Sequence, residues 1–164
     1  MINKMTINST FTHKGRVLKV KYYDLDSFSS LPYAKCQQVY GVCFYKDKMV
    51  IVSGEGTSGG WGLVGGHIEK GETYDQTLRR EVREETNMRV LKSYPIGVQE
   101  VTTPDGKVVF QLRYCAIVEP LGKFEKDPAG SVTEIKLINS EDYKKYFDWG
   151  EIGERIIQRA IDLK

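Results

Sequence analysis

The sequence predicts a layered α/β or α+β domain in which helices pack on a mixed β-sheet. Strand-like segments alternate along the chain with two helical segments, and this order is typical of helix-on-sheet layers. The 164 residues are enough to bury one hydrophobic core, and the chain has no internal repeat or low-complexity tract. We therefore expect a single domain over residues 1–164, of which residues 1–35 form an N-terminal strand and extension.

The first half of the chain carries strand signals followed by a glycine-rich loop. Residues Arg16–Leu25 alternate enough in polarity to form a strand within the N-terminal extension. Two apolar runs, Val39–Tyr45 and Met49–Val52, flank a short charged turn and together predict a hairpin. A loop rich in glycine and serine follows at Ser53–Gly62.

The strongest helix signal begins at Thr73. Thr73 and Gln76 have the spacing of a capping box, in which each side chain bonds a backbone amide at the helix start. The helix is expected to end near Thr86, because Asn87 readily adopts the left-handed conformation that closes a helix.

The second half of the chain predicts three more strands and a closing helix. Residues 90–101 and 107–121 are strand-like and are joined by the turn TPDGK, and a short strand is expected at Val132–Ile138. A final helix over Glu151–Leu163 is expected to pack on the sheet. Its apolar face contains Ile152, Ile156, Ala160 and Leu163.

Charge and cysteine content limit the partners and the compartment. The 24 basic and 22 acidic residues give a net charge of +2. A charge this small does not indicate electrostatic binding to a nucleic acid polymer or a membrane. Of the three cysteines, Cys43 and Cys115 lie in apolar runs that indicate buried free thiols in a reducing compartment. Because the first residues lack the apolar core of a signal peptide and no apolar run is long enough to span a membrane, we expect a cytoplasmic protein.

Three glutamates are concentrated in the predicted central helix. At about 100° per residue, Glu81, Glu84 and Glu85 fall in one sector of the helix, beside the apolar Leu78 and Val82. Like charges at this spacing repel by roughly 0.2–0.5 kcal/mol a pair, so a plain solvated face would favour opposite signs. Clustered carboxylates are what Mg²⁺ or Mn²⁺ requires, and a bound cation would offset their repulsion. The alternative is an ordinary solvated helix face.

The loop before this helix supplies a second half of the predicted site. Gly65 and Gly66 lack side chains, so their backbone can approach a ligand closely. Amides near a helix start favour anionic oxygen, and together with the acidic helix this loop predicts a metal-bridged diphosphate. Within the helix, Arg80 can pair with Glu84 four residues later or reach back to Glu72 in the loop.

The segment Gly66–Met88 resembles the Nudix box, G-x5-E-x7-R-E-U-x-E-E-x-G-U, where U is a bulky aliphatic residue. The matching positions are Gly66, Glu72, Arg80, Glu81, Val82, Glu84, Glu85 and Met88. The preceding residues WGLVGG also look like the flank of such a box. Asn87 replaces the usual glycine, but asparagine is the next-best residue for a left-handed helix end. Val64 replaces a frequent proline.

This resemblance to the MutT-like Nudix hydrolases implies a fold, an activity and a set of residue roles. The implied fold is an α/β/α sandwich around a mixed sheet. Glu81, Glu84 and Glu85 would hold Mg²⁺ or Mn²⁺, whereas Glu72 and Arg80 would pair and brace the loop. Glu134 matches a further acid that in some members joins the metal site or acts as the base. The sequence does not choose among Glu84, Glu85 and Glu134 as the base.

The resemblance implies hydrolysis of a phosphoanhydride in a nucleoside diphosphate linked to another group. The expected substrate is a small nucleotide: an ordinary or oxidised nucleoside triphosphate, or a nucleotide sugar such as ADP-ribose. The alternative is a Nudix-fold module that binds a nucleotide without cleaving it, although such modules are expected to have lost acids from the box. The N-terminal extension is compatible with a monomer or with a homodimer formed through its strand.

Overall fold

The computed structural model describes residues 5–57, 59–128 and 130–164. The first four residues of the predicted N-terminal extension, and Ser58 in the predicted glycine-rich loop, lie outside the described residues.

One mixed β-sheet forms the centre of the molecule. Its strands follow the order β1-β2-β7-β8-β3-β4-β5, and β6 and β9 pair with β3 and β4. The β3–β8 pair is parallel and the other pairs are antiparallel. This agrees with the predicted mixed sheet. The strands are β1 (Thr6–His13), β2 (Arg16–Asp24), β3 (Cys36–Tyr45), β4 (Lys48–Gly54), β5 (Trp61–Gly62), β6 (Val64–His67), β7 (Met88–Thr102), β8 (Val108–Pro120) and β9 (Val132–Ile138).

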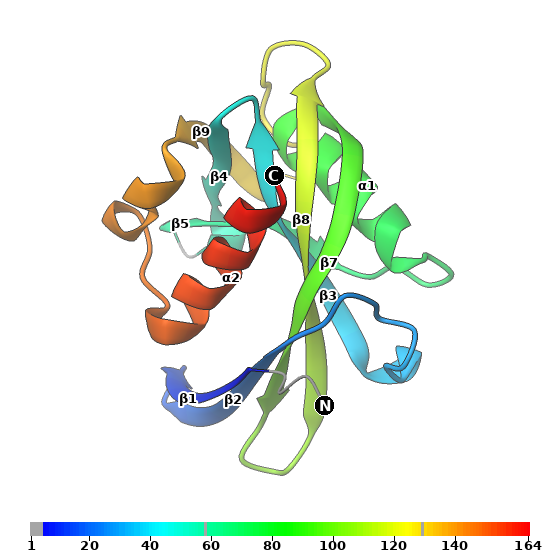
Figure 1. Ribbon diagram of the computed structural model, residues 1–164, viewed down its shortest axis with the longest axis vertical. Coiled ribbons are helices and arrows are strands. Elements are labelled where there is room, and N and C mark those ends of the chain that lie inside the picture. The colour runs from blue at the N-terminus through cyan, green and yellow to red at the C-terminus, as the bar shows by residue number, and fades with distance from the viewer. Residues whose placement is uncertain (1–4, 58, 129) are drawn as a thin grey trace.

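Two α-helices cover opposite faces of the sheet (Figure 1). Helix α1 (Tyr74–Thr86) packs against one buried cluster through Leu78 and Val82, and helix α2 (Gly150–Leu163) packs against a second cluster through Ile156 and Ala160. Neighbouring residues of β8 point alternately into the two clusters, as the period-two geometry of a strand requires. The layers therefore form the α/β/α sandwich that the sequence implied. Short 3-10 helices lie at Tyr33–Lys35, Glu55–Thr57 and Ser140–Lys145.

The predicted elements are confirmed, with two corrections. Strand β1 was not predicted as a strand, because its sequence TINSTFTH is largely polar and only Ile7 is buried; it forms by pairing with β2 along its whole length. Leu163 was placed on the packing face of the last helix, but it is exposed, because the buried contacts of α2 end near Ala160. The free cysteines Cys43 and Cys115 are buried as expected.

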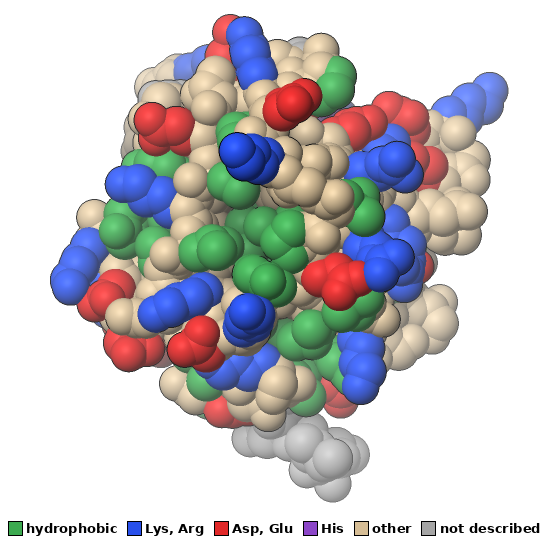
Figure 2. Space-filling model, turned by 90° about the horizontal axis from the view of Figure 1, so that it is seen from above, with side chains coloured by type: hydrophobic (Ala, Val, Ile, Leu, Met, Phe, Trp, Pro, Cys, Tyr) green, Lys and Arg blue, Asp and Glu red, His purple; other side chains and the backbone are tan. Residues whose placement is uncertain are grey.

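The surface mixes both signs of charge. Seen from above, basic and acidic side chains are interspersed around a small apolar area (Figure 2). This distribution agrees with the small net charge of +2. Within the described residues, no helix is both long and apolar enough to cross a membrane.

Candidate functional site

Helix α1 begins and ends as its sequence predicts. The Thr73 hydroxyl accepts a hydrogen bond from the Gln76 amide at 3.1 Å, and the Gln76 side chain accepts one from the Thr73 amide at 2.9 Å. At the other end, Asn87 adopts the left-handed conformation with a φ of 53°. The local sequence therefore fixes the length of the helix and, with it, the positions of its acids.

The aliphatic residues of α1 set how deeply each acid lies. Leu78 and Val82 are fully buried against the sheet. The three glutamates beside them differ in exposure. Glu85 is 7% exposed, and the side chains of Glu81 and Glu84 are 13% and 38% exposed. The three acids thus run from the interior to the surface, and none is splayed fully into solvent.

The glycines of strand β6 lie close to Glu81 and Glu85. The Gly65 amide donates a hydrogen bond to the Glu85 carboxylate at 2.6 Å. A Cβ atom on Gly66 would lie 2.5 Å from Glu81 Oε1, and one on Gly65 would lie 2.7 Å from the Cα of Tyr40 on β3. Gly65 therefore requires glycine, because a Cβ there would overlap the backbone of β3, whereas a Cβ on Gly66 would displace the Glu81 carboxylate.

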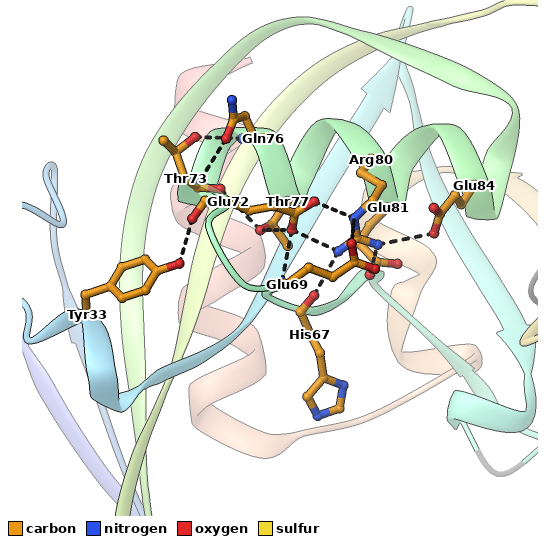
Figure 3. Close-up of polar contacts among 10 residues, drawn as sticks. All are labelled: Tyr33, His67, Glu69, Glu72, Thr73, Gln76, Thr77, Arg80, Glu81 and Glu84. Atoms are coloured by element: carbon orange, nitrogen blue, oxygen red, sulfur yellow. Dashed lines mark hydrogen bonds and ion pairs between the residues drawn. The ribbon is translucent and has the colours of Figure 1, made fainter.

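Arg80 lies at the centre of a network of acids and oxygens (Figure 3). Its Nε donates to Glu72 Oε1 at 2.7 Å, and its Nη1 donates to Glu81 at 2.8 Å and to Glu84 at 3.2 Å. Its Nη2 donates to the His67 carbonyl at 2.9 Å. The two pairings considered from sequence, with Glu84 and with Glu72, therefore occur together. One guanidinium joins the loop to the helix.

Glu72 is bound firmly in this network. Besides Arg80, the Thr77 hydroxyl donates to its carboxylate at 2.8 Å and the Glu69 amide at 3.1 Å. The hydrogen bond from Arg80 is the main reason that the pKa of Glu72 falls to about 2. The same contact raises the pKa of Arg80. Glu72 is therefore ionised at any ordinary pH and stays bonded to Arg80.

Glu85 and Glu81 are electrostatically different from Glu72. Burial raises the pKa of Glu85 to about 8; the Gly65 amide opposes this rise, and the nearby charges of Glu81 and Asp127 add to it. Burial also raises the pKa of Glu81, although Arg80 partly offsets the effect. Without a ligand, burial thus favours the protonated form of both carboxyl groups, and their ionisation requires additional positive charge nearby.

Asp127 is an acid of this region that the sequence reasoning missed. It lies in the segment between β8 and β9, is 3% exposed, and accepts a hydrogen bond from the Ser131 hydroxyl at 2.6 Å. Its charge raises the pKa of both Glu81 and Glu85. No periodic pattern marks it, because an irregular loop brings it to the site; only its chemical type could have been a signal.

Glu134 lies elsewhere. It is exposed on β9, where it pairs in register with Ser53 of β4, and it lines an open hollow with Trp61 and Thr133. The charge of Asp127, by contrast, raises the pKa of both Glu81 and Glu85. The structure thus brings Asp127 to the acids of α1, and the role of Glu134 stays a prediction.

The residues of the site have the right chemistry for a hard divalent cation. Such ions take carboxylate and other oxygen ligands, and partly buried carboxylates with excess negative charge are the donors they favour. With Arg80 bonded to Glu81 and Glu84, no three acidic, histidine or cysteine side chains within the described residues are arranged closely enough to hold an ion as they stand. The donor types fit, and the more exposed Glu84 is the acid with most freedom to exchange Arg80 for another partner.

Comparisons with known proteins identify a family and a fold. The family model of the NUDIX domain matches residues 36–160. The Bacillus subtilis pyrophosphohydrolase BsRppH superposes with a TM-score of 0.66 at 21% identity, covering 94% of this chain and 96% of that one. A NUDIX hydrolase from Nitrosomonas europaea gives 0.60 at 20% identity, covering 79% and 90%. A MutT NUDIX hydrolase from Burkholderia pseudomallei gives 0.60 at 13% identity, covering 76% and 97%. No curated protein sequence matches the chain.

Proposed function

The chain belongs to the Nudix family, and we propose that it is a pyrophosphohydrolase that uses Mg²⁺ or Mn²⁺ to cleave a phosphoanhydride in a nucleoside diphosphate derivative. The observation that carries this proposal is the buried Glu85 beside the half-buried Glu81, two carboxyl groups for which the chain supplies too little positive charge to favour ionisation of both. Leaving such charges buried destabilises a protein unless a ligand compensates them. A divalent cation that also binds a diphosphate is the ligand that would best compensate these carboxylates.

The roles of the residues follow from their positions. We assign Glu81, Glu84 and Glu85 to the cation, because Glu85 and Glu81 lie against Gly65 and Gly66 and Glu84 shares the Arg80 guanidinium with Glu81. When bound, the cation supplies positive charge that neutralises phosphate oxygens during cleavage. The glycine loop leaves room for the diphosphate beside the acids, since neither glycine carries a side chain there.

Arg80 and Glu72 act as positioning residues in this proposal. Arg80 bonds Glu72, Glu81 and the His67 carbonyl at once, so it holds the loop at a fixed distance from the helix. Because the Arg80–Glu72 pair is charged over the whole ordinary pH range, it orients the acids without itself exchanging a proton.

The base that accepts a proton from the attacking water is one of the acids of this region. Glu84, Glu85 and Glu134 are the candidates from the sequence, and Asp127 joins them because it lies close enough to raise the pKa of Glu81 and Glu85. A base must come within hydrogen-bond reach of the attacking water, directly or through one further water. By this criterion, the exposed Glu134 on β9 is the weakest of the four.

We further propose a small nucleotide as the partner and a cytoplasmic location. The near-balanced charge gives no support to a nucleic acid polymer as the main ligand, and three buried free thiols suit a reducing compartment. A monomer or a homodimer is compatible with the exposed edge strand β1.

The decisive experiment is a substrate panel assayed for released phosphate with Mg²⁺, with Mn²⁺ and with a chelator. The panel contains nucleoside triphosphates, nucleotide sugars including ADP-ribose, and dinucleoside polyphosphates. We expect at least one compound to be cleaved only in the presence of metal. Tight nucleotide binding without cleavage across the panel would instead identify a binding module. A protein whose melting temperature rises with neither metal nor nucleotide would contradict the proposal altogether.

A further inference from the structure

The segment between β2 and β3 contains an exposed tyrosine that reaches the Nudix box. Tyr33 begins the 3-10 helix Tyr33–Lys35, directly before β3. Its hydroxyl donates a hydrogen bond to the backbone carbonyl of Glu72 at 2.7 Å (Figure 3). A residue outside the box thus holds the loop that precedes α1, residues 67–73, which we call the box loop.

Aromatic packing fixes the position of the Tyr33 ring. The ring stacks on that of Tyr74, the first residue of α1, with centroids 5.7 Å apart and planes 22° apart. The buried Phe28 meets the Tyr74 ring edge-on at 5.9 Å and the Tyr114 ring of β8 at 5.1 Å. Such stacked and edge-on pairs are favourable beyond the area that they bury. The rings connect Tyr33 to the sheet, so its hydroxyl has a defined position.

The box loop is loosely packed where Tyr33 reaches it. Gly71 has a φ of 87°, and a Cβ there would meet nothing within 4 Å apart from its chain neighbours. A hollow of about 370 Å³ lies at this point and is lined by Tyr33, Gly71, Glu72, Thr73 and Tyr74. Glycine beside open space allows a loop to move. The Tyr33 hydroxyl therefore restrains a segment that packing leaves free.

Glu72 is the residue through which this restraint enters the site. Its carboxylate accepts hydrogen bonds from Arg80, from Thr77 and from the Glu69 amide, and all three belong to the box. Among the described residues that bond Glu72, Tyr33 is the one that lies outside the box. The main chain of Glu72 is thus anchored from outside, while its side chain binds residues of the box.

Arg80 connects Glu72 to the acids that we assign to the cation. Its Nε bonds Glu72 at 2.7 Å, and its Nη1 bonds Glu81 at 2.8 Å and Glu84 at 3.2 Å. A shift of the Glu72 main chain would move its carboxylate and, with it, the guanidinium that both acids share. Residues that orient metal ligands from outside in this way tune metal affinity and rate.

We propose that Tyr33 is a positioning residue of the metal site. Its hydroxyl fixes the main chain of Glu72, and Glu72 and Arg80 together keep the acids in positions that suit a cation. This inference rests on the proposed function, because it assumes that a cation binds at these acids. Burial alone gives little reason for the contact, since a tyrosine that is 50% exposed adds little to the hydrophobic core.

The first test measures binding of Mn²⁺ alone, from the electron paramagnetic resonance signal of the free ion, to protein without nucleotide. Tyr33→Phe keeps the ring that stacks on Tyr74 and removes only the donor. We expect the Kd for Mn²⁺ to rise by about 3- to 10-fold, less than the roughly 10- to 100-fold typical of a residue that bonds a metal ligand directly. An unchanged Kd would overturn the proposal.

Tyr94→Phe is the matched control for this substitution. It removes the hydroxyl of an exposed tyrosine on β7, and that hydroxyl has no hydrogen-bond partner among the described residues. The Kd for Mn²⁺ should therefore not change. An equal rise in Tyr94→Phe and Tyr33→Phe would mean that the contact with Glu72 is not the cause, and would contradict the proposal.

A double-mutant cycle then tests whether Tyr33 acts through Glu72. Glu72→Gln weakens the bond to Arg80, so the position of the main chain is no longer transmitted to the acids. Adding Tyr33→Phe to this variant should raise the Kd for Mn²⁺ by less than about twofold further, because the two substitutions interrupt the same connection. A contact that serves only the fold would give the same factor in both backgrounds.

Kinetics on the preferred substrate of the panel separates this inference from the proposed function. At limiting Mg²⁺, Tyr33→Phe should lower the rate by about 3- to 10-fold and leave KM for the nucleotide within about twofold, and excess Mg²⁺ should restore most of the rate. A loss that excess Mg²⁺ does not restore would overturn the positioning role. Normal cleavage with unchanged Mn²⁺ affinity would also overturn it and leave the hydrolase intact. Weakened Mn²⁺ binding in a protein that cleaves no nucleotide would support the positioning role and contradict the hydrolase.

Discussion

The two faces of the sheet bury ionisable groups of opposite type without full compensation. Under α1, burial raises the pKa of Glu81 and Glu85, and Arg80 and one backbone amide oppose the rise only in part. On the α2 face, Arg113 of β8 is buried and forms no ion pair within the described residues. A third region behaves differently: the buried Asp24 is bonded by Arg155 at 2.5 Å and lies 3.3 Å from Arg159. The groups at Asp24 are paired within the chain, whereas the incompletely paired groups under α1 are those that we assign to a ligand.

The largest expected effect concerns the acidic face. Glu84→Gln should fold normally and reduce kcat by about 10²–10³, because it removes one of the charges on which transition-state stabilisation depends. The substitution is nearly isosteric, and the Glu84 side chain makes its only described ion pair with Arg80, which keeps its other partners. Steady-state kinetics on the preferred substrate of the panel provides the measurement.

Glu141→Gln is the matched control for this substitution. It removes the same charge from an exposed residue of the 3-10 helix Ser140–Lys145, outside the acidic cluster and outside the candidate bases, so its kcat should stay within a few-fold of the unchanged protein. Near-normal turnover in Glu84→Gln, together with a large loss in Glu141→Gln, would reverse our assignment of the site.

A smaller effect is expected from Asp127, the acid that the structure adds to this face. Asp127→Asn keeps the size of the side chain and its ability to accept from Ser131, but removes the charge that acts on Glu81 and Glu85. We expect kcat to fall by about 10- to 100-fold, the range of a group that assists proton transfer or holds one ligand. A pH–rate profile of the variant should lose or shift one limb. An unchanged rate and profile would make Asp127 only a structural residue of its loop.

The acidic face could be predicted from the sequence because its geometry is local. Residues three and four apart on a helix must share a side, and Thr73 and Asn87 define where that helix starts and stops. The surroundings of Arg113 could not be predicted in this way. Arg113 is a single cation on an apolar strand, and the Tyr40 ring that contacts it comes from β3, far away in the sequence.

The same reasoning explains the other differences between sequence and structure. Strand β1 has too few apolar residues to be recognised, and it exists because β2 offers it a complete ladder. Asp127 reaches the acids through an irregular loop whose path no residue pattern encodes. Periodicity predicts which residues of one element lie together; it does not predict which elements or loops meet.

The acidic face should also make stability depend on pH when no metal is present. Glu85 has a folded pKa of about 8 against a usual value of 4.5, so it favours the protonated form, and its contribution is complete below about pH 4.5 and is lost as the pH rises to 8. Glu72, with a pKa near 2, changes its contribution only in acid and is constant over this range. The free energy of unfolding should therefore fall between pH 5 and 8, by on the order of 2 kcal/mol.

Urea denaturation of the chelator-treated protein at several pH values measures this slope. Glu85→Gln should flatten it, because the amide cannot ionise but still accepts from Gly65. Added Mg²⁺ should stabilise the unchanged protein most at the alkaline end, where Glu85 is charged, and should have little effect on the variant. A slope that persists in Glu85→Gln would place its origin in other groups.

The smallest effect is expected on the opposite face and tests whether the two faces follow one rule. If Arg113 is kept for a ligand rather than for the fold, then Arg113→Met, which keeps most of the side-chain volume and removes the buried charge, should raise the free energy of unfolding by about 1 kcal/mol. The loss of its contacts with Tyr40 and Gln111 opposes this gain and limits its size. Urea denaturation without ligand is again the measurement, with Arg89→Met as the exposed control. A destabilisation of more than about 2 kcal/mol would mean that Arg113 supports the fold as Arg155 does at Asp24, and that only the acids under α1 carry charge in excess.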